Sequence, residues 1–377
     1  MRTCGAAARG VMATAAVAAI TVSCTMGSAV ETMPATPAPA SAAPSSTNAE
    51  IAWPIKTRDH LDVWLHGFAM LQGDTVTALV PLYRRGYHDD LAVRKNRSNV
   101  TTQLDLNRAT LAARLRANPG LQAAQFLPLY FASWAEFNGG IDTFLQVDGD
   151  ARRVNDPETR TMIATLAGVF RTPADRDWLR MFAVSLRDEY DHFYHAYWVQ
   201  RQQELAPVLA RLDSLWTRTY YPKFIPYLRN TQLLSGDFYV SLPIDAEGRT
   251  LTEGPHSNGV AVGFPQTVDS AVTAIYVFAH EVSSPVVNSA VSDNTTPVEK
   301  REGVADRYTA NGLVRGGALL LQRVAPELVD GYERYYVQAA GARIETNVDS
   351  TFARVFALPE PIVTAIGRQM DVVMGGI

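Results

Sequence analysis

Apolar residues that return every three or four positions are the feature that most limits the folds open to this chain. From Trp53 onward such a stripe runs through Leu61, Trp64, Leu65 and Phe68. This spacing is typical of an amphipathic helix that buries one face. We therefore expect a body that is built mainly from helices.

Proline and glycine mark where further helices begin and end. A helix that carries Leu104 and Leu115 is expected to stop at residues 118–120, which read Asn-Pro-Gly. Proline is favoured at the first helical position, where its missing amide hydrogen costs nothing. Helices are therefore expected after Pro157, after Pro173, over residues 205–220 up to an interruption by Pro222 and Pro226, and after Thr296, Pro326 and Pro359.

Strand signals occur in one region, at residues 238–242 and 259–264. The polar stretch that separates them predicts a hairpin or a pair of sheet strands, followed by a short turn and another helix. The predicted fold class is mainly α with a small β-sheet (α+β). We expect a helical domain over residues 51–230 and a second domain over residues 231–377, with one continuous helical body as the alternative.

The first 24 residues have the order of an export signal. Basic residues precede an apolar stretch at positions 11–20, and a serine stands directly before Cys24. This resembles the lipobox of bacterial lipoproteins, which implies acylation of Cys24, with ordinary cleavage further along as the alternative. Residues 25–50 are mostly Pro, Ala, Ser and Thr and read as a disordered tether. The predicted location is the bacterial cell envelope, with a lipid anchor in the membrane and the body facing the periplasm or the exterior.

Composition excludes two kinds of chemistry. With Cys4 inside the predicted signal, Cys24 is the only other cysteine, so the mature chain has no intrachain disulfide and no thiolate nucleophile. The chain has 34 basic and 38 acidic residues, a net charge of −4. Because this leaves no basic surplus, nucleic acid is not an expected partner.

His280 and Glu281 lie late in an apolar helical run, at residues 272–288. In the motif His-Glu-x-x-His, two histidines one turn apart hold zinc and the glutamate activates the metal-bound water. Here the fifth residue is Ser284. The alternative interpretation is that His280 and Glu281 are only the polar edge of a helix that packs through Phe278 and its apolar neighbours.

The chain from residue 259 onward resembles the gluzincin (thermolysin-like) metallopeptidases. The resemblance implies that His280 is the first zinc ligand, Glu281 the catalytic base, and Glu302 the third ligand. It places Ser284 at the lost second ligand position and makes Asp306 the acceptor of a hydrogen bond from a ligand histidine. The continuation of this segment also resembles an uncharacterised bacterial group of gluzincin-like domains.

A serine hydroxyl is a poor replacement for a zinc-binding imidazole, so zinc would bind weakly or not at all. His256 and Glu299 are the candidate substitutes. The first function hypothesis is an envelope-tethered protein like a zinc metallopeptidase, weakly active or inactive, with a peptide substrate along residues 259–264. The alternative is a non-catalytic pseudoenzyme that binds a peptide or a partner protein in the retained cleft.

A second candidate metal site comes from a helix in which Asp188 and Asp191 precede His192 and His195 by one turn each. Such pairs more often stabilise a helix surface than bind metal. The aromatic cluster at residues 332–336 contains tyrosines that could steady an oxyanion, although aromatics at helical spacing usually line a core.

Overall fold

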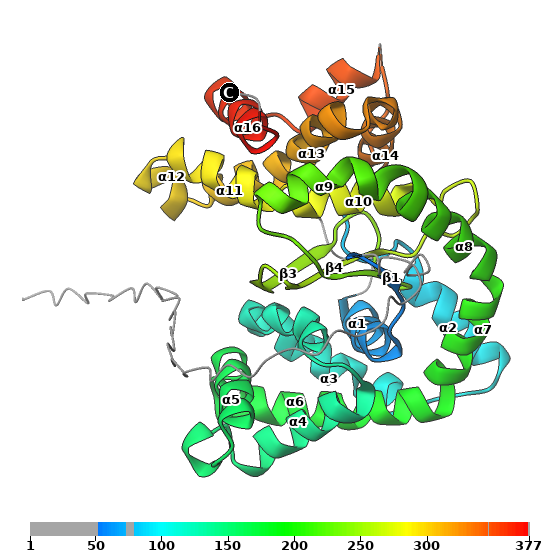
Figure 1. Ribbon diagram of the computed structural model, residues 1–377. Helices are drawn as coiled ribbons and strands as arrows, with labels where there is room; N and C mark the ends of the chain where they lie inside the picture. Colours follow the sequence, from blue (N-terminus) through cyan, green and yellow to red (C-terminus); the bar gives the residue numbers. More distant parts are fainter. Residues whose placement is uncertain (1–51, 73–78, 346, 376–377) are drawn as a thin grey trace, which may run out of the picture. The chain divides into compact units, whose positions relative to one another are not determined.

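A four-stranded mixed sheet lies between two sets of helices (Figure 1). The computed structural model describes residues 52–72, 79–345 and 347–375. The predicted signal peptide, Cys24 and the tether lie outside the described residues. From Glu50 onward the chain forms one unit, and the domain boundary near residue 230 stays a prediction.

The strand order is β1-β2-β4-β3. Neighbours β1 (Ile55–Lys56), β2 (Asp237–Ser241) and β4 (Ser257–Gly263) are parallel, and β3 (Arg249–Gly254) is antiparallel to β4. Strand β4 therefore has a partner on both sides. The prediction that a peptide pairs along residues 259–264 is wrong, because the backbone groups of β4 are already used in the sheet. The strands at the two edges of the sheet are β1 and β3.

The two strands predicted from sequence are present as β2 and β4, whereas β1 and β3 were not expected. Strand β3 reads Arg-Thr-Leu-Thr-Glu-Gly. It lacks the apolar run of a buried strand because it lies at the edge of the sheet, where polar side chains are tolerated. Strand β1 is only two residues long and has no periodicity to detect.

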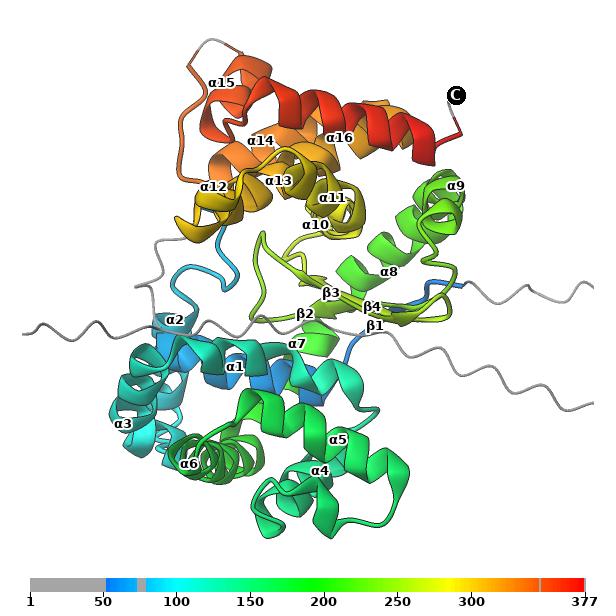
Figure 2. The same cartoon turned by 90° about the vertical axis from the view of Figure 1, so that its left-hand side faces the viewer.

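Alternate residues of β4 serve the two faces of the sheet. Val260 and Val262 belong to the main core, together with the residues of α10 (Thr273–Val282). Ala261 points to the other face, where it packs with Leu61 of α1 (Asp59–Gln72). Figures 1 and 2 show α10 and α1 on opposite sides of the strands. The sheet is thus covered by helices on both faces.

The helices between β1 and β2 cover the face of the sheet on which α1 lies. The last of them lead the chain toward the opposite face of the sheet. Helices α3 and α6 pack against each other, and both contact α1. The elements after α1 are α2 (Tyr87–Arg97), α3 (Gln103–Ala117), a 3-10 segment (Pro119–Tyr130), α4 (Trp134–Gln146), a second 3-10 segment (Ala151–Arg153), α5 (Pro157–Val169), α6 (Pro173–Glu189), a π-helical turn (Tyr190–Tyr194), α7 (His195–Glu204), α8 (Ala206–Leu215), a second π-helical turn (Trp216–Tyr220) and α9 (Tyr221–Asn230).

The predicted helix starts at Pro157 and Pro173 are confirmed. Asp156 caps α5 by accepting from an amide of its first turn, and Thr172 forms a reciprocal capping box with Asp175 at the start of α6. Such caps satisfy backbone donors that have no partner within the helix. The proline and capping residues therefore set these helix starts through contacts with the first turn alone.

The predicted interruption at Pro222 and Pro226 is wrong, since α9 contains both residues. Pro222 lies in the first turn of α9, where an amide hydrogen has no intrahelical partner. The π-helical turn Trp216–Tyr220 changes the hydrogen-bond pattern just before it. The chain therefore continues as a helix after one turn of different geometry.

The helices after β4 form the layer on the other face of the sheet. Helix α13 packs along α10 and α11, and α16 covers α11 and α13. The elements are α11 (Ser284–Asp293), α12 (Pro297–Arg301), α13 (Val304–Val324), a 3-10 segment (Pro326–Leu328), α14 (Val329–Ala339), α15 (Val348–Val355) and α16 (Glu360–Val373).

The predicted fold class, mainly α with a small β-sheet, is confirmed. Helices follow Thr296, Pro326 and Pro359 as expected. None of the helices in the described ranges combines the length and the hydropathy needed to cross a membrane.

Candidate metal centre around His280

Helix α10 carries the predicted motif into the interior. His280 is fully buried, Glu281 is 6% exposed, and Ile275, Phe278 and Val282 are fully buried as well. His280 and Glu281 are therefore not a solvent-facing edge of the helix. A buried imidazole beside a buried carboxyl group needs partners, because unpaired polar groups are costly away from water.

The imidazole of His280 is held between a tyrosine ring and two carboxyl groups. Its ring stacks on Tyr336 with centroids 5.4 Å apart. Nδ1 lies 3.1 Å from Oε1 of Glu281, and Nε2 lies 3.9 Å from Oε2 of Glu247. No atom of the described residues forms a hydrogen bond with Nε2.

Glu281 is fixed by the start of β3. Its Oε1 accepts a hydrogen bond from the backbone amide of Gly248 at 3.1 Å, and its Oε2 lies 3.4 Å from the hydroxyl of Thr250. A Cβ at residue 248 would lie 2.6 Å from the carbonyl oxygen of Ala261 and 2.9 Å from Cγ of Glu281. The close approach of β3 to the site therefore requires glycine at this position.

Glu247 precedes β3 in a loop that a distant segment holds in place. The backbone amide of Glu247 donates to the carbonyl of Pro81, and that of Asp245 donates to the carbonyl of Leu82. About a third of the Glu247 side chain is exposed. The carboxyl group thus lies at the solvent side of a site whose imidazole is buried.

Burial and neighbouring charges shift the pKa values of Glu247 and His280. Burial raises the pKa of Glu247 to about 7; the charge of His280 opposes this rise and that of Glu281 adds to it. For His280, burial lowers the pKa, but the hydrogen bond to Glu281 and the charge of Glu247 outweigh burial and raise it. The site therefore concentrates negative potential on one imidazole.

Glu247, His280 and Glu281 each offer a ligand atom, and these atoms lie within 4.8 Å of one another. Throughout the described ranges, no other group of three such side chains meets this condition. Sequence reasoning missed Glu247. Its only signal was a carboxylate directly before a glycine in the polar stretch ahead of β3, and such a pattern is too common to indicate a site.

The predicted third ligand and its neighbour lie elsewhere. Glu302 caps the short helix α12, Asp306 lies in the first turn of α13, and both are exposed. Helix α13 approaches His280 at Gly317, where a Cβ would lie 3.0 Å from Cα of His280. Asp306 precedes Gly317 by eleven residues, which is about 16 Å along a helix. The structure therefore does not bring Glu302 or Asp306 to His280, and both assignments are corrected.

Ser284 begins a new helix rather than continuing α10. Helix α10 ends at Val282, and Ser283 turns back to donate its hydroxyl hydrogen to the carbonyl of His280 at 2.7 Å. Pro285 lies in the first turn of α11, where a proline is tolerated because the amide hydrogen has no intrahelical partner there. His280, Ser284 and Glu302 do not form a zinc site, because one is a neutral hydroxyl and another is exposed and remote.

The candidate substitute ligands do not join the site either. His256 lies exposed in the turn between β3 and β4, with Nδ1 3.3 Å from the hydroxyl of Ser235. Glu299 is used in the capping box of α12, where it accepts from the amide of Thr296.

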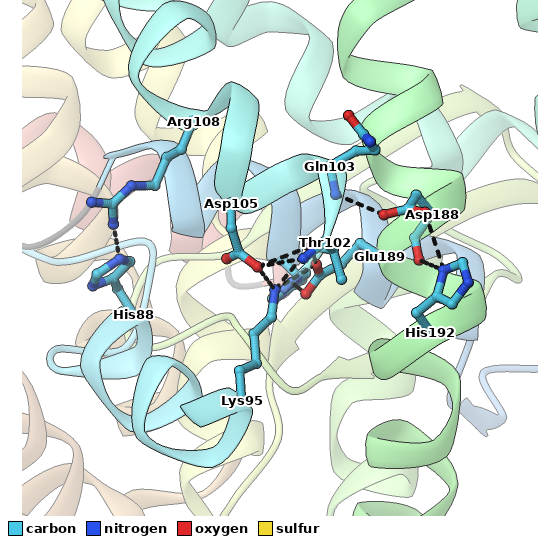
Figure 3. A network of polar contacts seen from close by, with 10 residues as sticks. His88, Lys95, Thr102, Gln103, Asp105, Arg108, Asp188, Glu189 and His192 are labelled. Atoms are coloured by element: carbon cyan, nitrogen blue, oxygen red, sulfur yellow. Dashed lines mark hydrogen bonds and ion pairs between the residues drawn. The ribbon is translucent and has the colours of Figure 1, made fainter. Parts of the chain in front are cut away.

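In the second candidate metal site, Asp188 and His192 make contacts that stabilise the fold. Figure 3 shows Asp188 facing the backbone of Gln103 and the ring of His192. The amide of Gln103 donates to Asp188 at 2.6 Å, and Nδ1 of His192 lies 3.1 Å from the same carboxylate. His195 is exposed with its ring against Tyr190. These contacts tie α3 to α6 and assemble no ligand set.

The tyrosines of α14 are part of the core. Tyr332 and Tyr336 are fully buried, and their hydroxyls donate to the carbonyls of Val314 and Ala246. Both hydroxyl hydrogens are therefore used, and the role of these rings is to wall the site around His280.

No protein-family model matches the chain, and comparison with curated proteins and with solved structures gives no match. The gluzincin resemblance therefore rests on the residues of this chain alone.

Proposed function

We propose that this protein is an envelope-tethered relative of the zinc metallopeptidases with an altered metal site, in which peptidase activity is weak or absent. The observation that carries the proposal is the placement of His280 and Glu281. Both are buried on the helix that follows β4, and Glu281 accepts hydrogen bonds from Gly248, just before β3, and from Thr250 of β3. This order of strand, turn and helix is the one that the resemblance implies. The predicted lipid at Cys24 would hold the body at a membrane.

The free edge of β3 supports a peptide as the ligand. An extended peptide adds to an exposed strand edge through backbone hydrogen bonds. Thr250 of β3 contacts Glu281, so a peptide paired with β3 would pass close to this carboxylate. The expected substrate strand is thus β3 and no longer β4.

Two departures argue that turnover is slow. Ser284 supplies a neutral hydroxyl where an imidazole is needed, and Glu302 is exposed on α12. Without these ligands the usual zinc set of the metallopeptidases cannot form.

The test is hydrolysis of a mixed library of fluorogenic peptides by the full-length chain, with Glu281→Gln as the matched control. The variant keeps an acceptor for the Gly248 amide, so the fold should be retained. We expect a rate far below the range of about 1 to 1,000 s⁻¹ that is typical of enzymes, and any signal should vanish in Glu281→Gln. Turnover within that range would contradict the altered site. Turnover that survives in Glu281→Gln would refute the assignment of the site.

The second candidate function is a non-catalytic protein that binds a peptide or a partner protein. It is favoured by the loss of the predicted ligand set together with two neighbouring hollows of about 440 and 520 Å³, both bordered by Glu253 at the end of β3. Such concave surfaces are usual for binding sites.

Photo-crosslinking tests whether a peptide binds along the edge of β3. A photoreactive residue at Thr252 of β3 should capture library peptides, whereas the same residue at Val184, exposed on α6, should not. Equal capture at both positions would argue against peptide pairing with β3.

A further inference from the structure

The imidazole of His280 has one nitrogen without a hydrogen-bond partner. Nε2 is buried, and the nearest charged atom is Oε2 of Glu247 at 3.9 Å. This separation is too long for a hydrogen bond. Buried polar atoms normally have a partner, so an unpaired one indicates a ligand that the protein atoms alone do not supply.

The other ring nitrogen has the partner that a metal-binding histidine usually has. Nδ1 lies 3.1 Å from Oε1 of Glu281, whose position is fixed by the amide of Gly248. A histidine that binds a metal through one nitrogen typically donates its second N–H to a carboxylate, which sets the tautomer. With the proton on Nδ1, the lone pair of Nε2 is free on the side of Glu247.

Within the described residues, no lysine or arginine forms a close ion pair with Glu247, although the charge of Arg249 acts on it from a longer distance. In the described part of the chain, its side chain forms no ion pair within 4.0 Å other than the one with His280. Its carboxylate oxygen and the imidazole nitrogen without a hydrogen-bond partner therefore lie 3.9 Å apart, close enough for one cation to bind both after a small movement of the Glu247 side chain.

We propose that Nε2 of His280 and the carboxylate of Glu247 bind a divalent cation, with Glu281 orienting the imidazole. Imidazole and carboxylate are ligands that suit Zn²⁺, at bond lengths of about 2.0 to 2.2 Å. Two such ligands at a tetrahedral angle lie about 3.4 Å apart, so the observed 3.9 Å must close by about half an ångström. The Glu247 side chain can make this movement because it is partly exposed and lies in a loop.

The proposed set replaces Ser284 and Glu302, the positions that the resemblance implies, with the carboxylate of Glu247 from the loop before β3. Of the two proposed ligands, Glu247 is the partly exposed one, whereas His280 is fully buried. The inference deepens the proposed function, since it concerns the same side chains, but a cation can be held here without any peptide being cut.

The test is titration of the full-length chain with Zn²⁺ in competition with a chromophoric chelator. Cys4 and Cys24 are replaced by serine in every sample, because thiolates bind zinc themselves. We expect one Zn²⁺ per chain. Glu247→Gln should weaken the affinity more than tenfold, and Glu281→Gln by about 10 to 100-fold, as is usual when the carboxylate behind a ligand histidine is removed.

The matched control is Glu302→Gln, which removes the same charge at the position that sequence reasoning favoured. Its affinity should stay within about twofold of the parent, since Glu302 is exposed on α12 and should exert no more than a screened effect. Circular dichroism and thermal unfolding check that each variant folds. If Glu247→Gln does not fold, Glu247→Asp takes its place, because it shortens the side chain by one methylene and so withdraws the carboxylate from His280.

Three results would overturn the inference. These are no stoichiometric binding at micromolar Zn²⁺, unchanged affinity in the Glu247 variant, or an equal loss in Glu302→Gln. If the chain binds one Zn²⁺ in a manner that depends on Glu247 but cuts no peptide, the cation site is supported and peptidase activity is refuted.

Discussion

Replacement of Glu189 by glutamine tests whether the polar network of Figure 3 is structural. The Glu189 carboxylate is fully buried, with Nε2 of His66 at 3.0 Å and Nζ of Lys95 at 2.7 Å, and it also accepts from the hydroxyl of Thr102. In Glu189→Gln the buried ammonium of Lys95 keeps only Asp105, at 2.5 Å, as an ion-pair partner. Breaking a buried pair by removing one charge typically costs about 3 to 5 kcal/mol. Because Asp105 remains, we expect a loss near the lower end.

The pKa of Glu189 gives a second estimate of the same loss in the free energy of unfolding. Burial alone would raise its pKa, but His66 and Lys95 outweigh burial and lower it from 4.5 to about 2. This difference corresponds to about 3 kcal/mol of stability at neutral pH. The group has a depressed pKa in the folded state, so its contribution is complete above pH 4.5 and is lost as the pH falls toward 2.

The assay is urea unfolding at pH 7 and pH 3. Glu189→Gln should lower the free energy of unfolding by about 3 kcal/mol at pH 7, and by less than half of that at pH 3. The control is the neighbouring Asp188→Asn, which keeps an acceptor for the Gln103 amide and should cost less than about 1 kcal/mol. A loss below about 1 kcal/mol in Glu189→Gln, or an equal loss at both pH values, would refute the reasoning.

Three further substitutions probe the packing around the site and one helix start. Phe278→Ala removes a fully buried ring of α10 that contacts four other aromatic rings; it should cost about 3 to 5 kcal/mol in urea unfolding, and a loss below about 1 kcal/mol would contradict this packing. Gly317→Ala would place a Cβ against the hydroxyl of Tyr332 and 3.0 Å from Cα of His280; the overpacking should cost about 1 to 3 kcal/mol, whereas an unchanged melting curve would mean that α13 and α10 separate easily. Thr172→Ala deletes the cap of α6 and should cost about 1 kcal/mol; Thr172→Ser, which keeps the hydroxyl, is the control and should retain most of the stability.

The helices were the most predictable part of this protein because their signals are local. Pro157 and Pro173 mark real helix starts, since a proline at the first turn and a capping side chain before it act within four residues. The same rules failed at Pro222 and Pro226, because both residues lie in α9, which follows a π-helical turn directly. The ring of Trp216, the first residue of that turn, packs against Phe278, which lies 62 positions further along the chain, and such a contact is not visible in the local sequence.

By itself the sequence determined the fold class, the helix starts, and the place of His280 and Glu281 on a buried helix after a strand, because amphipathic spacing and capping chemistry depend on near neighbours. Only the tertiary structure decided what surrounds His280. It excluded Glu302 and Asp306, which follow the motif at the right spacing but are exposed at the end of α12 and in the first turn of α13. It brought in Glu247, because strand β3 passes beside α10 and a loop carboxylate can meet a buried imidazole only where the chain folds back on itself.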